Sequence, residues 1–90
     1  MVFDWDAANA GHLAAHPVTP DEAEQALLNE HLTIETQRVG DEERTVCLGR
    51  TNAGRLLTFI YTERANKIRF VTVFPMSKHH VRVFLREMGQ

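Results

Sequence analysis

The chain has 90 residues, of which 43% are hydrophobic, and its formal net charge is −2. This length predicts a single domain over residues 1–90 with a small core. No apolar run is long enough to cross a membrane, and the acidic, aromatic start of the chain does not fit a secretory signal. Cys47 is the one cysteine. A disulfide within the chain is therefore excluded, a reducing cytoplasm is the expected setting, and Cys47 is expected to be a small buried residue.

Charge is divided unevenly along the chain. Residues 1–43 hold ten acidic side chains and one basic side chain, a net charge of −9, whereas residues 44–90 hold nine basic and two acidic side chains, a net charge of +7. A chain with this division can present a basic face, which indicates a polyanion or an acidic partner. The alternative is that the two halves neutralise one another within the fold.

The first predicted helix runs from about Ala7 to Ala15. Asp6 can cap it by accepting hydrogen bonds from the amides of the first turn, and Pro17 ends it because proline disfavours helix at the preceding residue. The spacing i, i+3, i+4, i+7 places four side chains on one stripe: Asn9, His12, Leu13 and His16. The two histidines have the spacing of a helical metal site, but no third ligand of the usual kind follows, and no metal is expected. Packing against the sheet, phosphate contact and acid–base work are the alternatives for these imidazoles.

A second helix is predicted from the segment Thr19-Pro20-Asp21-Glu22. Thr19 is the expected N-cap, Pro20 the first helical residue, and Glu22 the partner that closes a capping box. The predicted inward face consists of Ala23, Ala26 and Leu27.

After Glu30 the hydrophobic period changes to two, which predicts strands. Leu32, Ile34 and Thr36 alternate with polar residues, as in a half-buried strand. Further strands are expected over residues 45–49, 55–62 and 68–74, and the tight turns between them predict an antiparallel meander. The strand over 55–62 is the most apolar, so we expect it at the centre of the sheet, buried on both sides.

Ser77 is expected to cap a last helix with an apolar face of Val81, Phe84, Leu85 and Met88. The order helix, helix, four strands, helix predicts an α+β fold with two N-terminal helices, a four-stranded antiparallel meander sheet and a C-terminal helix.

The basic half contains the predicted phosphate-binding residues. Arginines at strand ends beside an apolar sheet face can hold a phosphodiester through two parallel hydrogen bonds. Cations in the first turn of a helix lie where the backbone amides also attract anions. The residues that meet these criteria are Arg44, Arg50, Arg55, Arg69 and Lys78, with His79 and His80 next to Lys78. The alternative for the cluster at the last helix is a solvated group without a role.

Several segments, taken in order, resemble one known family. They are Phe3-x-Trp5-Asp6-x-x-Asn9-x-x-His12-Leu13-x-x-His16-x-Val18-Thr19-Pro20-x-Glu22, Leu48-Gly49-Arg50-Thr51, Gly54-Arg55-Leu56-Leu57 and Ile68-Arg69-x-Val71-Thr72-x-x-x-Met76-Ser77. The ordered set is similar to the BrnT-type ribonuclease toxins and covers nearly the whole chain. The resemblance implies a RelE-like fold, an RNA substrate and a cognate antitoxin of a type II toxin–antitoxin pair.

The chain also departs from the family pattern. Pro17 replaces the usual glycine, and Phe74 replaces an arginine after the last strand. In the last helix His80 and Val81 replace a Glu-Arg pair, and Phe84 replaces a tyrosine. A metal-free ribonuclease needs a base, an acid and cations on the phosphate, and His79 or His80 could supply the proton transfers in place of the missing glutamate.

We therefore expect a cytoplasmic, metal-independent endoribonuclease toxin that needs no cofactor. The expected RNA-binding residues are Arg44, Arg50, Arg55, Arg69 and Lys78. The expected proton-transfer residues are His79, His80, His16 and His12. The alternative is a catalytically degenerate binding module that acts through protein or nucleic-acid contacts, with a homodimer through the last helix.

Overall fold

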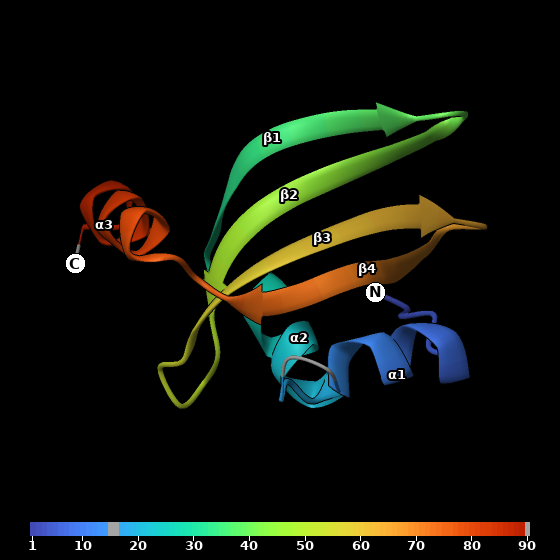
Figure 1. Ribbon diagram of the computed structural model, residues 1–90, viewed down its shortest axis with the longest axis horizontal. Coiled ribbons are helices and arrows are strands. Elements are labelled where there is room, and N and C mark those ends of the chain that lie inside the picture. Colours follow the sequence, from blue (N-terminus) through green and yellow to red (C-terminus); the bar gives the residue numbers. More distant parts are fainter. Residues whose placement is uncertain (15–16, 90) are drawn as a thin grey trace.

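A computed structural model describes residues 1–14 and 17–89 of the protein (Figure 1). Within them, helices α1 (Ala7–Ala14) and α2 (Pro20–Leu28) precede a sheet, and helix α3 (Lys78–Glu87) follows it. The strands are β1 (His31–Val39), β2 (Glu42–Arg50), β3 (Leu56–Arg64) and β4 (Lys67–Pro75), paired antiparallel in the order β1-β2-β3-β4. The predicted α+β class and meander topology are confirmed. None of the helices in the described ranges is long and apolar enough to span a membrane.

The start of α1 is set by the predicted cap. Asp6 Oδ1 accepts hydrogen bonds from the backbone N–H groups of Ala8 at 2.9 Å and Asn9 at 3.1 Å. These bonds satisfy two of the amides that a helix start leaves without an internal partner. The predicted last residue of this helix, Ala15, and the predicted site residue His16 lie outside the described residues.

The other two helices also begin at their predicted caps. Thr19 and Glu22 form the reciprocal capping box at the start of α2, and Ser77 Oγ accepts a hydrogen bond from His80 N at 3.1 Å at the start of α3. Local polar signals therefore determine where each helix starts.

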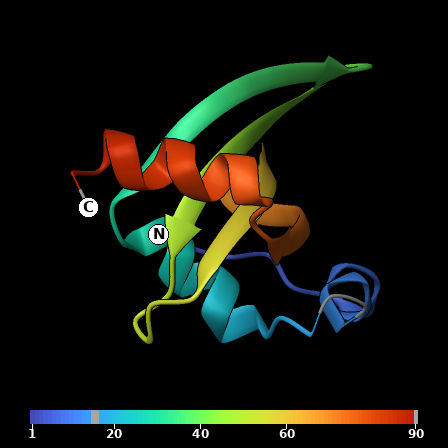
Figure 2. The ribbon, with the colours of Figure 1, turned by 60° about the vertical axis from the view of Figure 1, so that its left-hand side comes forward.

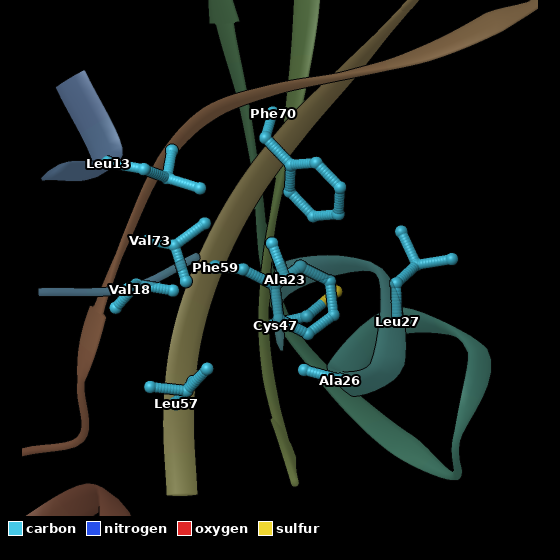
Figure 3. Close-up of a cluster of buried hydrophobic side chains, with 10 residues drawn as sticks. All are labelled: Leu13, Val18, Ala23, Ala26, Leu27, Cys47, Leu57, Phe59, Phe70 and Val73. Carbon is cyan, nitrogen blue, oxygen red and sulfur yellow. The ribbon is translucent and has the colours of Figure 1, made fainter. Parts of the chain in front are cut away.

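Helices α1 and α2 cover one face of the sheet, which we call the helical face (Figure 1). The opposite face, which we call the open face, is covered at one end by α3, which crosses over β2 (Figure 2). The core lies on the helical face (Figure 3) and consists of Leu13, Val18, Ala23, Ala26, Leu27, Cys47, Leu57, Phe59, Phe70 and Val73. Cys47 is fully buried, as predicted, and burial raises the pKa of its thiol.

The predicted half-burial of the first strand is wrong over most of its length. Ile34 is 37% exposed and Thr36 is also exposed. Strand β1 is an edge strand, its pairing with β2 shifts register between Thr33 and Glu35, and the β1–β2 hairpin extends beyond the helices (Figure 1). An alternating pattern shows which residues share a face, but it cannot show whether a helix covers that face.

The predicted central position of the most apolar strand is confirmed, because β3 lies between β2 and β4. Leu57 and Phe59 are fully buried on its helical face. On its open face burial is complete only at Thr58, whereas Leu56 and Ile60 are partly exposed.

Helix α2 approaches β2 closely at Gly49. A Cβ atom built on Gly49 would lie 2.5 Å from Ala26 O and 2.9 Å from the Phe59 ring. The small residues Ala23 and Ala26, both fully buried, allow the helix to lie this low on the sheet. Glycine is therefore required at position 49 for the packing of α2.

We predict that Gly49→Ala destabilises the protein by about 1–3 kcal/mol. The added methyl group would overlap the backbone carbonyl of Ala26, which can move only if helix α2 shifts away from the sheet. Urea unfolding followed by circular dichroism measures the change. Gly11→Ala is the matched control: nothing lies within 4 Å of its added Cβ, so in helix α1 it should be neutral or stabilise by up to about 1 kcal/mol. Equal stability of the two variants would contradict the close approach.

Candidate nucleic-acid interface

A hollow of about 210 Å³ lies where α1 meets the sheet. Its lining, which we call the basic hollow, consists of Ala8, Asn9, His12, Arg44, Arg64, Arg69, Phe70 and Val71. It gathers one imidazole and three guanidinium groups from α1 and three adjacent strands. Arg44, Arg69 and His12 were predicted site residues, and the fold brings these three together.

The register of the sheet explains why the three arginines meet. Arg69 is the partner of Thr62 in the β3–β4 pair. Side chains two apart on a strand share a face, so Arg64 lies on the same face as Thr62 and Arg69. Arg44 reaches this open face from β2, two residues before Val46, whose partner is Ile60.

Helix α1 is anchored to β4 by the stripe predicted from its sequence. Leu13 is fully buried, and Asn9 is 5% exposed. Asn9 Nδ2 donates to Asp4 O at 2.9 Å and to Phe70 O at 3.4 Å. His12 lies on the exposed side of the stripe, with Nε2 3.1 Å from Thr72 Oγ1. Asn9 and Leu13 thus hold the helix, whereas His12 lines the basic hollow.

Carboxylates of the acidic half neutralise the arginines of the basic hollow. Asp6 Oδ2 lies 2.8 Å from Arg69 Nη1, and Asp4 Oδ2 lies 3.5 Å from the same atom. The bond from Arg69 holds the pKa of Asp6 below its ordinary value, and the same bond raises the pKa of Arg69. The alternative of internal neutralisation is therefore confirmed for this part of the charge.

Glu42 forms the second set of ion pairs. Its carboxylate accepts from Arg44 Nε at 2.7 Å and from Arg64 Nη2 at 2.7 Å. The hydrogen bond from Arg44, which has the larger effect, and the hydrogen bond from Arg64 lower the pKa of the Glu42 carboxyl group. Glu42 itself lines a separate hollow of about 390 Å³, together with Asp41, Glu43, Thr45, Tyr61, Thr62 and Glu63. That hollow is larger than the basic hollow, but its four carboxylates would repel a phosphate.

Two predicted RNA-binding arginines lie away from the basic hollow. Arg55 is on the helical face, where Nη1 donates to Pro17 O at 2.8 Å and pairs with the Glu22 carboxylate at 3.1 Å. Arg50 lies against α3, with Cζ 5.7 Å from the centre of the buried Phe84 ring. The fold does not bring either residue to the hollow, and both make contacts within the protein.

Lys78, His79 and His80 form the first turn of α3, as expected. The rings of His79 and His80 are 5.5 Å apart between centroids. Strand β4 connects this cluster with the basic hollow: from Thr72, beside His12, to Pro75 the chain advances about 10 Å. Within residues 1–14 and 17–89, no three His, Cys, Asp or Glu side chains converge as a metal site would require.

Arg64 is the arginine of the basic hollow that was not predicted from the sequence. It lies beside the tight turn at Ala65 and Asn66, which both have positive φ. The available signal was the alternation from Ile60 through Thr62 to Arg64, which places Arg64 on the open face. Its proximity to Arg44 depends on the pairing register, which the sequence does not state.

A family model described as the ribonuclease toxin BrnT of type II toxin–antitoxin systems matches residues 5–80. The chain belongs to the BrnT toxin family. A search of curated proteins and a search of solved structures each returned no match. The predicted family is thus confirmed, and this family implies a ribonuclease toxin with an RNA substrate and an antitoxin partner. The BrnT match extends over the basic hollow and reaches the first turn of α3.

We predict that Glu22→Gln reduces stability at neutral pH and that the difference from the parent chain disappears in acid. The bond from the Thr19 amide, together with Arg55, lowers the pKa of Glu22. A depressed folded-state pKa contributes stability above the unfolded value of about 4.3, and this stability is lost as pH falls through the folded value. Melting temperatures between pH 7 and pH 3 measure the difference. Glu30→Gln, an equal charge change at an exposed position after α2, is the control, and a gap that persists in acid would contradict the prediction.

Proposed function

We propose that this BrnT-family chain is a metal-independent endoribonuclease that binds RNA on the open face of its sheet and works in the cytoplasm beside its antitoxin. The observation that carries the proposal is the basic hollow, in which His12, Arg44, Arg64 and Arg69 converge from four elements. Guanidinium groups match the geometry of phosphate oxygens and can bind them through paired hydrogen bonds.

RNA carries its own nucleophile, the ribose 2′-hydroxyl. Cleavage needs a base that removes the 2′-hydroxyl proton, an acid that protonates the departing 5′-oxygen, and cations that stabilise the charge on the phosphate in the transition state. Arginine and histidine side chains can supply all three functions, and the products are a 2′,3′-cyclic phosphate and a 5′-hydroxyl. In this proposal Arg44, Arg64 and Arg69 hold the phosphate.

The proton transfers belong to the histidines. His12 lines the basic hollow and is the candidate within reach of a phosphate bound there. His79 and His80, with Lys78, begin α3 at the end of the same face, so an RNA strand along β4 would meet both groups. An imidazole suits both roles because its unperturbed pKa lies near neutral pH.

The alternative is a catalytically degenerate binding module. The observation in its favour is that Phe84, in place of the family tyrosine, is fully buried against the sheet and serves packing. Such a module would bind partners through an α3 whose other apolar side chains are only partly covered, as in a homodimer. Its signature is a stable dimer in solution without nuclease activity, measured by light scattering and an RNA cleavage assay.

We predict that the double variant Arg44→Gln/Arg64→Gln binds RNA about tenfold more weakly and loses growth arrest when induced in bacteria. Removing two phosphate contacts should also flatten the dependence of RNA affinity on salt. Arg38→Gln/Arg86→Gln removes the same charge at two exposed arginines outside the hollow and should retain activity. If both double variants lose affinity equally, net charge and not the hollow binds RNA.

We predict further that the parent chain cleaves RNA in excess EDTA and leaves 2′,3′-cyclic phosphate ends, which mass spectrometry of the fragments identifies. His12→Ala, or His79→Ala with His80→Ala, should lower the cleavage rate by about 100-fold or more where the histidine transfers a proton. Lost cleavage in EDTA would overturn metal independence. Absence of cleavage and growth arrest by the parent chain would favour the degenerate module.

A further inference from the structure

The arginines of the basic hollow pair with two different carboxylates, Asp6 and Glu42, and only one of these carboxylates has a second structural role. Asp6, which binds Arg69, also accepts two backbone hydrogen bonds at the start of α1. Releasing Arg69 would therefore disturb the helix start. Glu42 has no such second function: among the residues that the structure describes, its side chain bonds only to Arg44 and Arg64.

The Glu42 carboxylate presents two oxygens to the two guanidinium groups in the way that a phosphate would. Arg64 donates from Nε at 3.0 Å and from Nη2 at 2.7 Å to Oε1, and Arg44 Nε donates at 2.7 Å to Oε2. Both carboxylate oxygens of Glu42 accept hydrogen bonds from these arginines. The same guanidinium N–H groups are the ones that would donate to the oxygens of an RNA phosphate.

The position of Glu42 explains how it could be displaced. It is the first residue of β2 and pairs with Val39 across the two-residue turn Gly40-Asp41. Glu42 lines the separate hollow of about 390 Å³ that carries four carboxylates, whereas Arg44 and Arg64 line the basic hollow. The Arg64 side chain is 55% exposed and the Arg44 side chain 32%, so both can turn from Glu42 toward a ligand in the basic hollow.

We propose that Glu42 is a positioning residue that competes with RNA phosphate for Arg44 and Arg64 and so sets the affinity of the basic hollow. This inference rests on the proposed function. RNA binding then exchanges one set of ion pairs for another: a phosphate takes the two guanidinium groups and the Glu42 carboxylate returns to water. Exchange of this kind weakens binding, and it also speeds product release because the carboxylate is present to recapture the arginines.

The test is Glu42→Gln in the full-length chain, with a fluorescein-labelled single-stranded 2′-O-methyl RNA that cannot be cleaved. Fluorescence anisotropy should show about threefold to fivefold tighter binding, the gain expected when one partly exposed competing ion-pair set is removed. The slope of log affinity against log salt should steepen by about 0.7, the value for one additional phosphate contact on a single strand. Glu42→Asp, which shortens the reach of the carboxylate, should bind with intermediate affinity.

Glu43→Gln is the matched control, since it changes the same charge at the adjacent residue, whose exposed side chain lies 3.7 Å from Arg38. The inference holds if Glu42→Gln gains affinity and salt slope and Glu43→Gln gains neither. Equal gains by both variants reduce the effect to net charge and overturn it. Unchanged or weaker binding by a folded Glu42→Gln also overturns it, while RNA binding that depends on Arg44 and Arg64 leaves the proposed function intact. Absence of RNA binding by the parent chain overturns both.

Discussion

Asp6 joins the start of helix α1 to strand β4, and the position of the candidate site depends on this connection. One of its oxygens caps α1 through the amides of Ala8 and Asn9, and its carboxylate pairs with Arg69 on β4. Asn9 completes the connection by bonding Asp4 O and Phe70 O. These contacts fix the start of α1 against the edge of the sheet. Because His12 follows Asp6 by less than two helical turns, they also fix the imidazole at the basic hollow. The geometry of the candidate site thus depends on an interaction whose first purpose is to start a helix.

The uneven division of charge along the chain produces ion pairs within the fold as well as a basic hollow on its surface. Acids that precede the sheet neutralise arginines from residues 44–90 in two places, with Glu22 on Arg55 and Asp6 on Arg69. Glu42 and its two arginines repeat the pattern across the β2–β3 pair. On the helical face the Glu22–Arg55 pair ties the capping box of α2 to the start of β3. On the open face the pairs surround a hollow large enough for a phosphate. In the proposed function, neutralisation and anion binding are compatible, because the same guanidinium groups pair with the carboxylate or with the phosphate in turn.

Helix starts, strand order and fold class could be predicted from the sequence because their causes are local. Each helix start depends on a capping hydrogen bond between residues three apart in the sequence. These pairs are Thr19 with Glu22, Asp6 with Asn9, and Ser77 with His80. The candidate site could be predicted only in part, since its geometry is not local. Arg44 and Arg69, two predicted site residues, line the basic hollow, and Arg64 lines it although it was not predicted. Arg55, which was also predicted, lies on the other face of the sheet. Each outcome depends on the pairing register and on which face the helices cover. Exposure of β1 could not be predicted for the same reason.

One departure from the pattern expected of BrnT toxins, Phe74 in place of an arginine, lies at the α3 end of the open face. Phe74 is paired with Thr58 on the open face, and Thr58 Oγ1 is a buried hydroxyl with no hydrogen-bond partner among the described residues. A buried hydroxyl without a partner costs free energy, and an arginine in place of Phe74 would put donors beside it. The chain bears this cost at the end of the open face nearest α3, whereas Arg44, Arg64 and Arg69 lie toward the other end of that face, on three adjacent strands. In the proposed function, phosphate therefore binds in the basic hollow and not at position 74, and His12, beside Thr72, and His79 and His80, at the start of α3, are the groups that move protons.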